Sequence, residues 1–124
     1  MRPSASPAKR IPRSFGYAVE GLLALLRTTP NFWVHLVAAL FALAASVLLG
    51  LSPLEGAVVV LTIALVLIVE AVNTVVETVC DRVSPSYDPL VKRAKDISAT
   101  AVLISALAAV AVACLLFGPR LLRS

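Results

Sequence analysis

The sequence predicts an all-α integral membrane protein, with an N-terminal amphipathic helix at the membrane interface followed by three transmembrane helices. Of its 124 residues, 60% are hydrophobic and the mean hydropathy is +0.96, whereas a soluble domain is about 45–50% apolar. Apolar runs long enough to cross a bilayer recur along the chain. The chain is too short for a separate soluble domain, so we predict one membrane domain at 10–119 between tails at 1–9 and 120–124.

The N-terminal segment is predicted to be a surface helix over residues 10–28, after a disordered cytoplasmic tail. At about 100° per residue, apolar side chains such as Phe15 and Leu22 fall on one face. Arg10 and Arg13 fall on the opposite face. A basic amphipathic helix of this kind is expected to lie in the membrane interface.

Three transmembrane helices are expected after the surface helix. The first covers 32–51, and the turn at 50–53 contains a glycine and a proline that can begin the next helix. The second covers 53–83. The third covers 90–117, where Gly118-Pro119 is expected to end the helix.

The placement of Lys and Arg predicts the orientation. Five basic residues precede the first span, four lie between the second and third spans, and none lies in the first turn. The positive-inside rule then puts the N-terminus in the cytoplasm and the C-terminus outside. The net charge of +4 follows from this topology, so no nucleic-acid partner is expected. Cys80 and Cys114 should lie on opposite sides of the bilayer, too far apart for a disulfide.

Four polar residues share one face of the second span: Glu70, Asn73, Glu77 and Asp81. They fall within a stripe roughly 80° wide that follows fourteen residues without a charge, 56–69. Acidic groups beside lipid are costly and usually functional. Three carboxylates on one stripe repel each other, so we predict a bound cation. Mg²⁺ is the candidate, because it takes hard oxygen ligands and arrives with nucleotide phosphates.

The third helix brings a second polar face to the same membrane edge: Lys92, Lys95, Asp96 and Ala99. Carboxylates on one helix and lysines on the next suit Mg²⁺ together with a polyphosphate. A remaining carboxylate could take a proton from a lipid hydroxyl. No Walker loop and no kinase glycine loop is present, so a soluble nucleotide-binding fold is excluded.

The stripe also fits two alternative roles. Glu70 could be the carrier carboxylate of a small transporter or proton relay, although such groups usually lie near the membrane midplane. Charged residues at an interface can also anchor helices by snorkelling, which suits Arg82 or Arg93 taken singly better than three acids on one face.

The run from Glu70 to Arg82, followed by the tetrapeptide at 93–96, resembles the bacterial diacylglycerol kinase and undecaprenol kinase family. The resemblance covers roughly residues 10–117. It implies a homotrimer in the bacterial cytoplasmic (inner) membrane, with active sites between subunits at the cytoplasmic interface. It also implies ATP with Mg²⁺ as the phosphoryl donor. A lipid alcohol, diacylglycerol or undecaprenol, would be the acceptor.

The resemblance also implies roles for individual residues. Glu70 matches the catalytic base, Asn73 lies beside it, and Glu77 matches a metal ligand. Glu70 and Ala99 would contact the lipid substrate, and Asp81 is a further candidate metal ligand. The positions that would contact nucleotide are Arg10, Tyr17, Glu77, Ser86, Tyr87, Asp88, Lys95 and Asp96.

The sequence departs from the family pattern at Thr29, where the family usually has a second metal-binding glutamate. This departure leaves three possibilities: weaker metal binding, a contribution from Asp81, or a catalytically impaired member with a structural role. Asn31 and His35 resemble the undecaprenol kinase branch. Because carboxylates are unfavourable against lipid, we also expect subunits to associate and cover the stripe.

Overall fold

Four helices make up the regular secondary structure of residues 6–123, which the computed structural model describes. Within this range, residues 6–30 and residues 31–123 form two separate compact units. Three of the four helices are long and apolar enough to cross a membrane, in agreement with the predicted number of spans. The helices are α1 (Pro7–Thr28), α2 (Pro30–Leu48), α3 (Pro53–Val83) and α4 (Pro89–Arg123).

Helix α1 begins slightly before the predicted start, because Pro7 occupies the first helical position, where its missing N–H costs nothing. None of its residues is buried. On the apolar face, the side chain of Phe15 is 75% exposed and Ile11 is similarly uncovered. Within its own unit, therefore, α1 is an amphipathic helix whose apolar face has no protein cover.

The turn between α2 and α3 ends α2 three residues earlier than expected. Gly50 adopts a positive φ of 68°, which glycine tolerates because it lacks a Cβ. The amide of Leu51 donates to the carbonyl of Ser46 at 3.0 Å, and that of Gly50 donates to Val47 at 3.3 Å. This pair of bonds is a Schellman motif. A capping box between Ser52 and Glu55 then starts α3.

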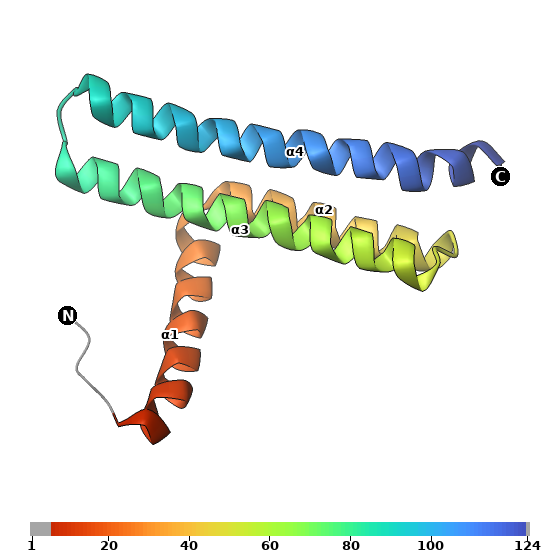
Figure 1. Cartoon of the computed structure of the whole chain (residues 1–124), viewed down its shortest axis with the longest axis horizontal. Coiled ribbons are helices and arrows are strands. Elements are labelled where there is room, and N and C mark those ends of the chain that lie inside the picture. The colour runs from red at the N-terminus through yellow and green to blue at the C-terminus, as the bar shows by residue number, and fades with distance from the viewer. Residues whose placement is uncertain (1–5, 124) are drawn as a thin grey trace. The chain divides into compact units, whose positions relative to one another are not determined.

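Helices α3 and α4 pack closely against each other and run antiparallel, so that the end of α4 lies near the turn between α2 and α3 (Figure 1). An ion pair joins them near each end. Lys95 Nζ lies 2.8 Å from Asp81 Oδ1, and Arg120 Nη2 lies 2.7 Å from Glu55 Oε1. The register of the two helices is thereby defined at both ends.

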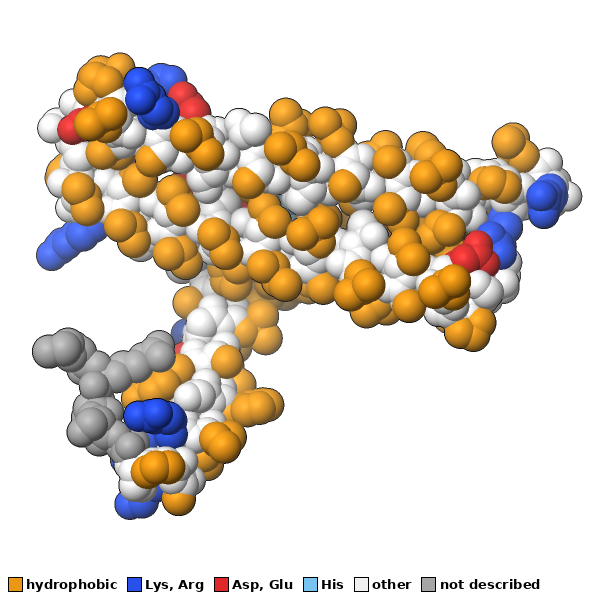
Figure 2. Space-filling model, viewed as in Figure 1, with side chains coloured by type: hydrophobic (Ala, Val, Ile, Leu, Met, Phe, Trp, Pro, Cys, Tyr) orange, Lys and Arg blue, Asp and Glu red, His pale blue; other side chains and the backbone are white. Residues whose placement is uncertain are grey.

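The surface of α2, α3 and α4 is largely apolar. Figure 2 shows hydrophobic side chains over the middle of these helices and charged side chains near their ends. Among the described residues only Phe32 and Val59 are buried hydrophobic side chains, and Glu70 and Ser105 are buried polar ones. A soluble protein would not leave so much apolar surface in water, whereas a bilayer solvates it.

The prediction that Gly118-Pro119 ends the third long helix is wrong, since α4 continues to Arg123. Proline within a helix removes a hydrogen bond and disturbs the preceding turn. Arg120 stabilises the turn around the proline in another way: its guanidinium donates to the carbonyl of Leu116 at 3.2 Å and makes two bonds to the Glu55 carboxylate. Prolines are tolerated within membrane-spanning helices where neighbouring side chains stabilise the surrounding turn.

Candidate active site

The predicted polar stripe lies on one uninterrupted helix, α3, and its members differ in burial. Glu70 is 3% exposed, whereas Glu77 and Asp81 are open to the exterior. The stripe therefore begins inside the packed helices and ends at an open surface. A buried carboxylate is costly unless it has a partner or a chemical task, so Glu70 is the most informative member of the stripe.

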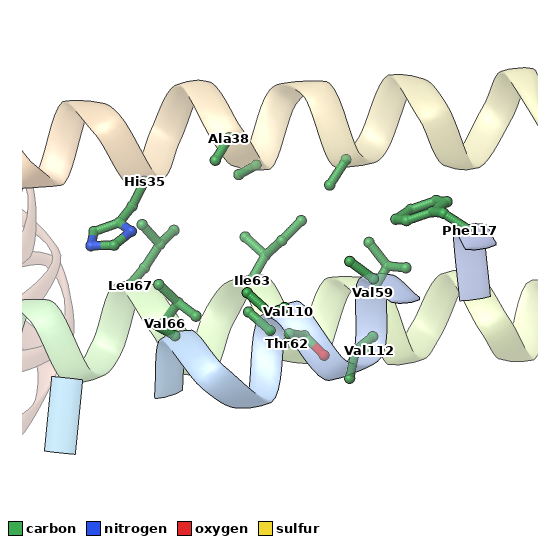
Figure 3. Close-up of a pocket in the computed structure, with 15 residues that line it drawn as sticks. His35, Ala38, Val59, Thr62, Ile63, Val66, Leu67, Val110, Val112 and Phe117 are labelled. Carbon is green, nitrogen blue, oxygen red and sulfur yellow. The ribbon is translucent and has the colours of Figure 1, made fainter. Parts of the chain in front are cut away.

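The partner of Glu70 is His35 on α2. The His35 Nε2 atom lies 3.6 Å from Glu70 Oε2. His35 also stands at one end of a cavity of about 330 Å³ between α2, α3 and α4, as Figure 3 shows. The other lining side chains are alanine, valine, leucine, isoleucine, phenylalanine and Thr62. Thr62 donates to the carbonyl of Val58 in its own helix, so the cavity is essentially apolar with a polar head.

A chain of hydrogen bonds connects α4 to the exposed part of the stripe. Ser98 Oγ donates to Asn73 Oδ1 at 2.7 Å, and Asn73 Nδ2 donates to Glu77 Oε1 at 3.2 Å. Because its oxygen faces Ser98, the Asn73 amide presents its NH₂ group to Glu77. The Glu77 carboxylate is therefore oriented through Asn73 by a side chain of the neighbouring helix.

The charged residues predicted on α4 are engaged with nearby acids. Lys95 bonds to Asp81 across the two helices, and Lys92 bonds to Asp96 within α4 at 2.6 Å. The sequence predicts that lysines of the third span meet acids of the second, and the contact of Lys95 with Asp81 confirms this for one pair. Asp81 already carries a cation partner, so it is a poorer metal ligand than Glu77.

The donor set for a metal is small. Across residues 6–123 no group of three or more His, Cys, Asp or Glu side chains is placed to hold a metal ion. Of the three acids on the stripe, Glu77 has no ion-pair partner within the described chain. Its one hydrogen bond comes from Asn73 and leaves carboxylate lone pairs open. Glu77 therefore fits one position of a metal that takes its remaining ligands from phosphate and water.

The loop between α3 and α4 holds three of the residues predicted to contact nucleotide. Asp88 caps α4 by accepting bonds from the amides of Leu90 and Val91. Tyr87 is exposed, and the carbonyl of Ser86 accepts a bond from the Ser84 hydroxyl. The structure thus gives Asp88 a capping role that the sequence pattern did not predict.

The remaining predicted residues fall in two places. Ala99 is exposed on α4, next to Ser98. Arg10 and Tyr17 belong to α1, and Thr29 follows that helix directly, so all three lie in the N-terminal unit. These three residues and the stripe therefore belong to different units of the chain.

Two residues of the site were not assigned a role from the sequence. Ser98 lies three positions after Lys95, so helical spacing places it on the same face, and that spacing was the available signal. His35 had been related only to a family branch. Its contact with Glu70 joins two helices, and no spacing within one helix predicts such a contact.

The fold and the site together define a small helical protein that has three helices long and apolar enough to cross a membrane, a buried carboxylate, and a cluster of charges where α3 ends and α4 begins. Residues 16–117 match the sequence profile of the prokaryotic diacylglycerol kinase family. The chain belongs to this family, which favours a kinase over the transporter alternative.

Similar proteins carry two names. A diacylglycerol kinase of Synechocystis is 44% identical over 87% of this chain, and the chain spans 63% of the length of that relative. An undecaprenol kinase of Bacillus subtilis is 34% identical over 88% of this chain and 89% of its own length. A diacylglycerol kinase of Escherichia coli is 35% identical over 86% of this chain and 88% of its own length.

Proposed function

We propose that this protein is a lipid kinase that transfers the γ-phosphoryl group of ATP to the hydroxyl of a membrane lipid alcohol. Membership of the family supports the class of reaction. The observation that carries the assignment to particular residues is the burial of Glu70 against His35, which lines one end of an apolar cavity between the helices. A carboxylate there can meet the hydroxyl of a lipid whose chain stays in the hydrophobic phase.

In the proposed reaction Glu70 is the general base. Its carboxylate accepts the proton of the lipid hydroxyl while the hydroxyl oxygen forms a bond to the γ-phosphorus, and the bond from that phosphorus to the β-bridging oxygen breaks to release ADP. Proton transfer to a positioned base contributes about 10²–10⁴-fold to such a step. Positioning and charge neutralisation supply the rest of phosphoryl transfer.

Mg²⁺ is the proposed metal, with Glu77 as its protein ligand. When bound, the metal neutralises charge on the phosphoryl oxygens. The hydrogen bond from Asn73 holds the Glu77 carboxylate in one orientation, which supports this assignment. Lys95, Asp96 and the loop at 86–88 would contact the nucleotide, as would Arg10 and Tyr17 of α1. Ala99 would contact the lipid.

We further propose a membrane location, an orientation and an oligomeric state for the enzyme. The exposed apolar face of α1 suits the membrane interface, and the basic residues favour a cytoplasmic N-terminus in the inner membrane. Charged groups beside lipid favour association of subunits, and a homotrimer is the assembly that the family resemblance implies.

The test is label transfer from ATP carrying a labelled γ-phosphate. Purified protein in detergent receives diacylglycerol and undecaprenol side by side, and the lipid fraction is separated and counted. We expect label in at least one lipid phosphate, dependent on protein and Mg²⁺. Absence of label from both lipids, with folded protein and intact ATP, would overturn the proposal. The ratio of the two products identifies the substrate.

A further inference from the structure

His35 lies where a proton could pass between the buried base and the exterior. Its side chain is 22% exposed, whereas the Glu70 side chain in contact with it is 4% exposed. His35 is the one histidine of the sequence, and histidine is the side chain that most readily exchanges protons near neutral pH. The position and the chemistry of this residue therefore both suit proton transfer.

The proposed base, Glu70, must release a proton from a buried position after each turnover. Once Glu70 has taken the proton of the lipid hydroxyl, that proton must leave before the next cycle. Glu70 is almost closed to water, so direct release is hindered. His35 contacts the Glu70 carboxylate, and it belongs to a different helix, α2.

We propose that His35 receives the proton of Glu70 after phosphoryl transfer. This inference rests on the proposed lipid kinase function. Before the transfer the neutral imidazole carries its ring proton on Nδ1, so that Nε2, 3.6 Å from Glu70 Oε2, is free to accept a proton. After transfer, the proton moves from the Glu70 carboxyl to His35 Nε2, neutral imidazole becomes imidazolium, and Glu70 is again a carboxylate. The imidazolium then gives the proton to water at its exposed edge.

No further titratable group among the described residues lines the cavity and competes for this proton. The lining residues from α4 are alanine, valine and phenylalanine, and those from α3 are aliphatic apart from Thr62. Helix α2 contributes His35 and three alanines. Figure 3 shows the imidazole at the end of this apolar lining. Of the residues that line this cavity, His35 is therefore the one with a titratable side chain, and it is the one in contact with Glu70.

The first arm of the test compares His35→Ala and His35→Gln with wild type for turnover of lipid phosphorylation. Because the base remains, we expect the loss in kcat to be on the order of 10-fold, smaller than the loss of the base itself, with little change in KM for ATP. Free imidazole should restore turnover of His35→Ala, where the side chain leaves space, and should not restore His35→Gln. Ser46→Ala is the control on the same helix, since its hydroxyl bonds to the carbonyl of Ala42 in α2.

The second arm needs no activity. A sample labelled with ¹⁵N-histidine reports on His35 alone, and we expect its Nε2 signal to move between wild type and Glu70→Gln because the charged partner is lost. Wild-type turnover in both His35 variants, or a lack of imidazole rescue together with an unmoved Nε2 signal, would overturn the inference. An inactive wild type with a shifted signal would instead contradict the lipid kinase function and leave the His35–Glu70 contact standing.

Discussion

Glu70 and Glu77 lie on the same face of α3, seven residues apart, yet their different surroundings suit different chemical roles. Glu70 is buried and faces an imidazole, whereas Glu77 is exposed and accepts one hydrogen bond from Asn73. A shielded carboxylate suits proton abstraction, and an open carboxylate suits a metal that brings phosphate with it.

Changing Glu77 should therefore alter the dependence on Mg²⁺. In Glu77→Gln we expect weaker metal binding and partial recovery of activity at excess Mg²⁺, because mass action offsets a lost ligand.

Thr29→Glu adds the carboxylate usual in the family and should lower the Mg²⁺ concentration at half-maximal rate. Titration of lipid phosphorylation with Mg²⁺ measures both. An unchanged Mg²⁺ dependence in both variants would mean that the metal is placed wrongly.

Ser98→Ala tests the hydrogen-bond chain from α4 to Glu77. The variant leaves the Asn73 carbonyl without its donor, and the loss of one such bond costs about 0.5–1.5 kcal/mol. We expect a lower unfolding midpoint together with a higher Mg²⁺ requirement. Thr100→Ala is the matched control, because its hydroxyl bonds to a carbonyl of its own helix. Equal behaviour of the two variants would remove the positioning role of Ser98.

At the residue scale, the sequence predicted the members of the stripe because they obey the period of a single helix. It did not predict the partners. The contacts of Glu70 with His35 and of Asn73 with Ser98 each join two helices. They depend on the register between helices, which local periodicity does not contain.

At the scale of the helices too, ends marked by the local sequence were predicted, and an end that involves a contact between helices was not. The bounds of α3 agree with prediction at Pro53 and Val83, since proline, a capping box and a serine mark them locally. The end of α4 lies beyond the predicted position, and the added turn contains Arg120, which forms an ion pair with Glu55 on the neighbouring helix. The local signal for termination is thus present together with a contact between helices that the local sequence does not contain.

Arg120→Gln should loosen the last turn of α4, so that the helix ends near Gly118-Pro119, as the local sequence predicts. Without the bonds to Glu55 and to the carbonyl of Leu116, the turn after Pro119, which already lacks one backbone donor, loses its side-chain support. We expect amides beyond Pro119 to exchange hydrogen faster while the middle of α4 is unaffected. Hydrogen exchange with mass spectrometry measures this difference. Arg123→Gln is the control at the exposed end, and equal exchange in both variants would contradict the role of Arg120.

At the scale of the whole molecule, three long apolar helices and the uneven placement of Lys and Arg predict one orientation in the membrane. In a background with Cys80 and Cys114 replaced by alanine, a cysteine at Ser52 should react with an impermeant thiol reagent outside intact cells. One at Ser86 should react only after the membrane is opened. Labelling of both positions from the same side would exclude the three-span topology.

The central claim joins these scales: a carboxylate buried among three membrane helices, next to His35 near the start of α2, abstracts the proton of a lipid hydroxyl. Lipid phosphorylation by Glu70→Gln, compared with wild type in the same detergent and with nucleotide binding measured on the same samples, tests it most directly. We predict a fall in turnover of about 10²–10⁴-fold with Mg²⁺–ATP binding largely retained. Wild-type turnover in Glu70→Gln would contradict the claim.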